Sequence, residues 1–197
     1  MTATGYLPMV RRSVALPALA ALLAALAVWQ FDRPAGTNSA GAAAAHIFMS
    51  AKGQKTGDFL GDSNQKGHQA DTTVLAYSYE IVSPRDAASG QATGKRQHKP
   101  ISITKALGSN SPQYLNALAT NETINTVVIN FFKADKGGSL VNYYRVTLTD
   151  ASLADISQHS ISGGEVSEDY SFTFRKIQQD DLIAKKTWVD DWAAPVS

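Results

Sequence analysis

The sequence contains no cysteine, and this absence removes several kinds of protein chemistry at once. Without thiols the chain has no disulfide framework, no thiolate metal site and no cysteine nucleophile. It also lacks an excess of charge of either sign, because 18 Lys and Arg residues stand against 17 Asp and Glu residues. Sequence-independent binding of nucleic acid needs a broad basic surface. We therefore expect no nucleic-acid partner.

The usual catalytic and metal-binding motifs are missing as well. The glycines before Lys95 do not have the spacing of a phosphate-binding loop, and no G-x-S-x-G elbow is present. The adjacent carboxylates at 180–181 and 190–191 point apart on extended chain, so they cannot share a proton. No two of the four histidines have a metal-ligand spacing: His46, His68, His98 and His159. The sequence therefore predicts a protein that is not an enzyme, with no catalytic residue, cofactor or metal.

The N-terminal part reads as a targeting segment. Arg11 and Arg12 precede an apolar run at 14–28, which predicts a signal peptide or membrane anchor over residues 1–31. The small and polar residues 32–45 predict a flexible linker. If this leader is used, the protein is secreted or periplasmic, with the membrane involved only through the leader; otherwise it is cytoplasmic before secretion. A cleaved leader, an anchor and a misassigned start all remain open.

The body of the chain, residues 46–178, has the alternating pattern of half-buried strands with turn residues between them. One helix is expected in "SPQYLNALAT", with Ser111 as N-cap, Pro112 at the first helical position and Asn121 at the end. The pattern predicts a mainly β fold, a small antiparallel β-barrel with one α-helix, preceded by the apolar leader. The expected strands lie at 46–51, 72–82, 101–104, 124–134, 139–157 and 170–177.

Two segments do not fit a simple strand–turn alternation. Residues 83–97 form a long loop rich in chain-breaking residues, and loops of this length usually have a function. Residues 179–197 form a C-terminal extension with two tryptophans among charged residues. We expect this extension to cap the barrel or to meet a neighbouring molecule.

The order of these segments resembles the haemolysin-coregulated (Hcp) family, the tube proteins of type VI secretion. The most specific part is H-K-P-x-x-I-T-K followed by S-P-x-x-L at 98–115, with K-G-H at 66–68 upstream. The resemblance covers about residues 46–178. It implies that six copies close into a ring, that rings stack into a hollow tube, and that the tube can carry effectors. The implied partners are the chain itself, secreted effectors, and spike and sheath proteins.

The resemblance also implies which residues mediate contacts. The loop would reach the next ring, and Lys95, Arg96 and Lys99 would pair with acidic groups on the neighbouring copy. The polar side of the helix, with Gln113, Asn116 and Thr120, would face the lumen. The expected ring-stacking residues are Ser83, Arg85, Asp86, Gly90, Gly94, Lys95, Arg96 and Lys99. The alternative reading is an exported, monomeric β-barrel binding module for a small ligand, with the loop as a mobile tip.

Overall fold

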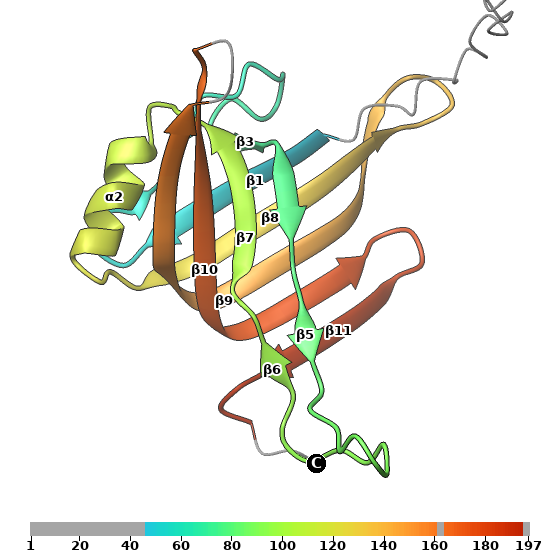
Figure 1. Cartoon of the computed structure of the whole chain (residues 1–197). Helices are drawn as coiled ribbons and strands as arrows, with labels where there is room; N and C mark the ends of the chain where they lie inside the picture. Colours follow the sequence, from blue (N-terminus) through green and yellow to red (C-terminus); the bar gives the residue numbers. More distant parts are fainter. Residues whose placement is uncertain (1–45, 161–163, 195–197) are drawn as a thin grey trace, which may run out of the picture. The chain divides into compact units, whose positions relative to one another are not determined.

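The structure is a computed structural model that describes residues 46–160 and 164–194. The expected leader (1–31) and linker (32–45) lie outside the described residues. Within the described ranges, none of the helical structure is long and apolar enough to cross a membrane. These residues form a curved antiparallel sheet with a single described helix, so the expected mainly β fold with one helix is confirmed (Figure 1).

The centre of the sheet consists of three long strands that are consecutive in sequence: β8 (Ile124–Ala134), β9 (Leu140–Ser160) and β10 (Val166–Asp181). Each pairs antiparallel with the next along most of its length. Their alternating apolar residues explain the inner face, because Val146 and Leu148 on β9 and Tyr170 and Phe172 on β10 are all buried. The aromatic face expected for the last strand is thus the face that packs into the core.

Shorter strands extend this centre on both sides. The order across the sheet is β2-β1-β8-β9-β10-β7-β4. β3 pairs with β1, and β11 pairs with the C-terminal half of β10. The bounds of these strands are β1 (His46–Gly53), β2 (Gly57–Asp58), β3 (Thr72–Val74), β4 (Ala76–Ser78), β7 (Ile101–Ala106) and β11 (Lys186–Asp191).

The single strand expected at 72–82 is in fact three short strands, and this part of the prediction is wrong. The chain changes partner at Leu75, because β3 pairs with β1 whereas β4 pairs with β7. Leu75 is 59% exposed and donates its backbone N–H to the Thr104 carbonyl. It therefore does not share a buried face with Tyr77. Among the described strands the pairs do not join into a closed ring, so the sheet is curved but the expected closed barrel is not formed.

The helix α2 (Ser111–Ala119) lies beside one end of the sheet (Figure 1). Pro112 is in its first turn as expected, but the N-cap is Asn110 and not Ser111. Tyr114 and Ala117 are buried, and the Tyr114 ring packs on Phe59 with 4.4 Å between ring centroids. Asn121, with φ of 50°, follows the helix in the left-handed region that asparagine tolerates.

Ser111 has a different role, because its hydroxyl belongs to a buried ionic network. Lys105 Nζ lies 2.7 Å from Glu168 Oε2, and the two side chains are 1% and 0% exposed. The Ser111 hydroxyl accepts a hydrogen bond from Lys105 Nζ and donates one to Glu168 Oε2. Gln158 and Tyr170 also donate to this carboxylate. The network thereby joins β7, β9, β10 and the first turn of α2.

Burial by itself disfavours the charge of Glu168. The hydrogen bonds from Lys105, Ser111, Gln158 and Tyr170 outweigh that penalty and lower the pKa of Glu168 below its ordinary value. The Lys105–Glu168 ion pair stabilises the fold only while both charges are present, because removal of one leaves the other buried without a counter-charge.

We predict that Lys105→Met lowers the free energy of unfolding by about 3–5 kcal/mol, because it leaves the Glu168 carboxylate buried without its cation. The double variant K105M/E168M replaces both charges with apolar groups and should recover much of this loss. Equilibrium denaturation of the full chain measures both values. A K105M protein as stable as the parent would contradict the assignment of the network as a main support of the fold.

Candidate functional site

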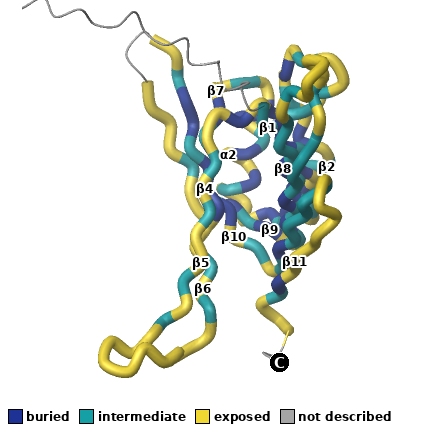
Figure 2. The backbone as a smooth tube through the Cα atoms, turned by 90° about the vertical axis from the view of Figure 1, so that its right-hand side faces the viewer, coloured by how far each residue is buried: buried dark blue, intermediate teal, exposed yellow. Residues whose placement is uncertain are grey.

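The long loop expected at 83–97 is the end of a two-stranded arm that leaves the main sheet. Its strands are β5 (Ile81–Val82) and β6 (Gln97–His98), which pair with each other in a separate sheet. We call residues 81–98 the arm. Figure 2 shows its end exposed and directed away from the sheet. The long loop is therefore a projecting element rather than a cover for the core.

The tip of the arm is ordered by its own hydrogen bonds. Asp86 Oδ1 accepts from the backbone N–H and the hydroxyl of Ser89 and from the N–H of Ala88, and these bonds lower the pKa of Asp86. Arg85 donates to the carbonyl of Gly90 at 3.0 Å. Gly90 has φ of +70°, a conformation that glycine adopts without strain. The tip is thus a turn whose shape is fixed by its own hydrogen bonds.

The predicted contact residues fall into two groups along the arm. Five lie in the exposed end of the arm: Ser83, Arg85, Asp86, Gly90 and Gly94. Lys95, Arg96 and Lys99 lie at its base, and of these Lys95 and Lys99 are exposed. Whether any of them touches another copy of the chain stays a prediction.

Arg96 already has an acidic partner within its own chain. Its guanidinium donates through Nε and Nη2 to both carboxylate oxygens of Asp190 on β11. His98 Nε2 lies 2.9 Å from the same carboxylate, and the side chains of His98 and Asp190 are only 2% and 6% exposed. We call Arg96, His98 and Asp190 the arm clamp. Arg96 thus has a bidentate acidic partner inside its own subunit, and its expected pairing with a neighbouring copy stays a prediction.

Aromatic side chains surround the clamp. The ring of His98 lies 5.4 Å from those of Phe174 and Trp192 and 6.3 Å from Trp188, measured between centroids. Its Nδ1 is 2.6 Å from the Tyr79 hydroxyl. Burial and the nearby Arg96 guanidinium lower the pKa of His98. A neutral ring fits both contacts, because Nε2–H donates to Asp190 while Nδ1 accepts from Tyr79.

Tyr79, His98 and Asp190 have the order of a nucleophile, a base and an orienting acid, but their environment does not favour that chemistry. Burial raises the pKa of Tyr79, although Arg96 acts in the opposite direction. A tyrosine that donates to His98 and resists ionisation is a poor nucleophile. Within the described ranges there is also no group of three side chains that could hold a metal ion. The arrangement suits mechanical support of the arm.

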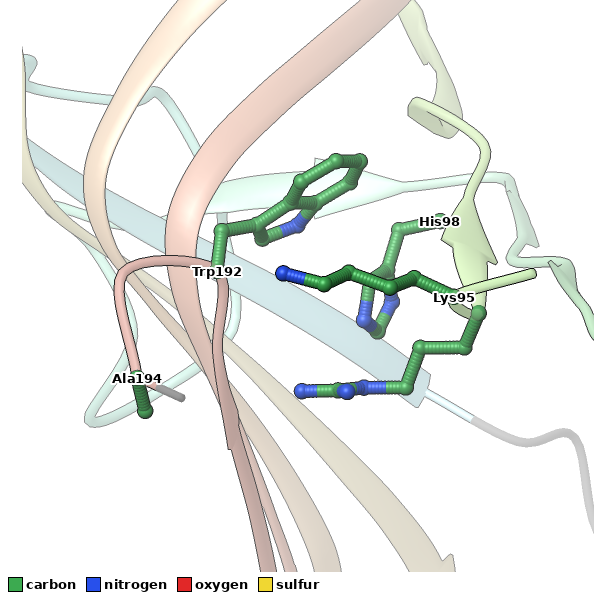
Figure 3. Close-up of a pocket in the computed structure, with 5 residues that line it drawn as sticks. Lys95, His98, Trp192 and Ala194 are labelled. Atoms are coloured by element: carbon green, nitrogen blue, oxygen red, sulfur yellow. The ribbon is translucent and has the colours of Figure 1, made fainter. Parts of the chain in front are cut away.

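Two hollows lie next to the clamp. The larger has a volume of about 240 Å³, below the usual range for small-molecule sites. The smaller, shown in Figure 3, has about 50 Å³, and the Lys95 side chain extends across it toward Trp192. The larger is lined by His98, Lys99, Pro100, Thr173, Phe174 and Trp192. The hollows beside the clamp are therefore small for a ligand site, and the alternative of a small-ligand binding module stays a prediction.

The polar residues of α2 occupy one side of the helix, as expected from their spacing. Asn116 and Thr120 are exposed and Gln113 is half-buried, whereas Tyr114 and Ala117 face the core. Their orientation toward a lumen stays a prediction.

Sequence reasoning missed the acid that completes the clamp. Asp190 was recognised only as half of a pair of adjacent carboxylates. The only signal that pointed toward this contact was the combination of a basic, histidine-containing motif at 95–99 with a tail of mixed tryptophan and aspartate.

We predict that the free energy of unfolding falls as the pH drops from 7.5 to 5.5, partly through His98. The unfolded chain takes up a proton on this residue near its ordinary pKa of 6.5, whereas the folded chain, with the lower pKa, resists it. His98→Gln should therefore flatten this part of the stability profile. The matched control is H159Q, which removes a histidine whose side chain is 43% exposed rather than buried. Equal slopes for H98Q and the parent would contradict the neutral, buried state.

Comparison with known proteins agrees with this geometry. The sequence model of the family described as "Type VI secretion system effector, Hcp" matches residues 48–180. The chain is 33% identical to the "Major exported protein" of Pseudomonas aeruginosa over 166 residues, which are 76% of this chain and 96% of the relative.

Solved structures show the same fold. A crystal structure of an Hcp protein aligns with a TM-score of 0.71 and 25% identity, covering 75% of this chain and 99% of that one. The secreted protein Hcp3 from Pseudomonas aeruginosa aligns with a TM-score of 0.66 and 28% identity, over 77% and 100% of the two chains. A family match over most of the described fold, together with these relatives, shows that the chain belongs to the Hcp family of type VI secretion proteins.

Proposed function

We propose that this chain is a structural subunit of a type VI secretion tube, and not an enzyme. Six copies close into a ring, rings stack through the arm, and the hollow tube carries effectors. The observation that carries this proposal is the arm itself. Its tip is held in a defined shape by Asp86 and Arg85, although it is exposed and directed away from the sheet of the described residues (Figure 2). An exposed loop with a fixed shape is suited to contact another molecule.

Ring closure requires two different surfaces on each copy, one of which binds the other on the next copy. The sheet is open, and its outermost strands β2 and β4 offer two different ends for such a contact. Because strands of two and three residues expose few unpaired backbone groups, the contact with the next copy would rest mainly on side chains. The helix residues Gln113, Asn116 and Thr120 would line the lumen, where exposed polar groups suit a water-filled channel.

The names of the relatives describe exported and secreted proteins, and we propose export for this chain as well. Effectors, spike and sheath proteins are the proposed partners beyond the chain itself. The use of the leader at 1–31 for this export stays a prediction, with a periplasmic or extracellular location if it is used.

We expect the full chain to form homohexamers in solution and longer stacks at higher concentration. Mass photometry gives the mass of the particles, and negative-stain microscopy shows their outline. A chain that remains monomeric at every concentration and ionic strength would contradict the proposal and favour the monomeric binding module.

The stacking role of the arm can be tested at its tip. The chain has no cysteine, so Ala87→Cys introduces a unique thiol in the exposed turn and leaves the Asp86–Ser89 hydrogen bonds in place. We expect maleimide to label this thiol readily in separate rings and much more slowly in stacked tubes. Lys136→Cys, in the turn between β8 and β9, is a matched exposed control outside the arm. Equal labelling of A87C in rings and tubes, with K136C also unchanged, would exclude the arm from the stacking contact.

A further inference from the structure

We propose that β11 sets the direction of the arm, and that the arm clamp is the contact through which it does so. The inference concerns the subunit alone. Its consequence for stacking rests on the proposed function.

The arm leaves the sheet because its path along β10 is already occupied. β7 pairs with the first half of β10 up to Phe172, and β11 pairs with the same strand from Lys176 onward. Both ladders are on the edge opposite β9, which pairs with β10 over its whole length. Since β6 precedes β7 by only two residues, it would extend the β7 ladder along β10 if that edge were free. β11 instead occupies this part of the β10 edge, and the arm therefore leaves the sheet.

The backbone alone fixes this turn weakly. Between the arm and the main sheet, residues 79–80 and 99–100 belong to no strand, and Pro100 has no N–H to donate. At this point a single backbone hydrogen bond, from the Lys99 N–H to the Glu80 carbonyl, joins the chain segment that enters the arm to the segment that leaves it. The ladder between β5 and β6 contains two residue pairs, and one further bridge, between Arg85 and Ala92, lies nearer the tip. Two-stranded ribbons of this length are marginally stable without further support.

The clamp supplies that support from outside the arm. His98 is on β6 and Arg96 directly precedes this strand, whereas Asp190 is on β11. Asp190 follows Arg96 by 94 residues and His98 by 92. All three donor atoms converge on one carboxylate that is nearly excluded from solvent. Bidentate contacts to a guanidinium fix geometry as well as distance. Apolar packing contributes less, because a hollow of about 240 Å³ lies beside His98 and Trp192 remains 52% exposed.

Asp190→Asn tests the clamp with little change in shape, since it removes the negative charge that Arg96 and His98 share. The matched control is D191N on the neighbouring residue. Asp191 contacts Arg175 at 2.6 Å, and Arg175 keeps Asp150 as a second partner. Spin labels on A87C in the arm tip and on N125C in β8 report the distance between the arm and the sheet by pulsed electron paramagnetic resonance. The experiment uses the full chain at a concentration below that of ring assembly.

We expect one narrow distance distribution in the parent and in D191N, and a clearly broader or shifted one in D190N. Arg96→Gln leaves β11 and the His98 contact in place, so it provides a second variant with a smaller expected broadening if D190N does not fold. A distribution in D190N or R96Q that matches the parent would overturn the proposal.

The same variants separate this inference from the proposed function. If the parent forms tubes, we expect D190N to form rings and to lose stacking, whereas D191N should stack normally. If D190N stacks like the parent and its arm distances are unchanged, the clamp does not set the direction of the arm, while the proposed tube function stands. If the parent forms no rings at all, the tube function fails, and the distance measurement still decides the role of the clamp.

Discussion

The structure depends on how the edge of β10 is shared. A strand edge can hydrogen-bond to only one neighbour at each residue, and here β7 uses the first half while β11 uses the second. The boundary between them, near Phe174, is where the arm departs. The same strand contributes Glu168 to the buried network that anchors the helix. One strand therefore positions both elements that the proposed tube would use, the projecting arm and the polar helix.

Three residues of the motif that led to the Hcp family acquire a physical reason from this arrangement. Lys105, at the end of H-K-P-x-x-I-T-K, and Ser111, at the start of S-P-x-x-L, meet at the Glu168 carboxylate. His98, the first residue of the motif, is buried against Asp190. The motif thus marks two places where charge is buried and must be compensated. These requirements are structural, which agrees with a protein whose proposed role is mechanical.

Much of the fold could be predicted from the sequence because it depends on local patterns. Alternation identified β8 and β9, and Pro112 located the start of the helix. The errors arose where a distant segment decides the outcome. The partner change at Leu75 depends on β1 and β7, and the role of Ser111 depends on Glu168. For the site, the sequence identified the long loop that forms the arm and the basic residues where the arm begins. The contact between Arg96 and Asp190 could not be predicted, because the two residues are 94 positions apart and no local pattern links them.

The account predicts that the arm is the element that joins one ring to the next. The most direct measurement is electron cryomicroscopy of assemblies of the full chain, at a resolution that traces residues 83–97. The account predicts six-fold rings with these residues in contact with the adjacent ring at every boundary. Rings joined through other surfaces, with residues 83–97 free in solvent, would contradict it.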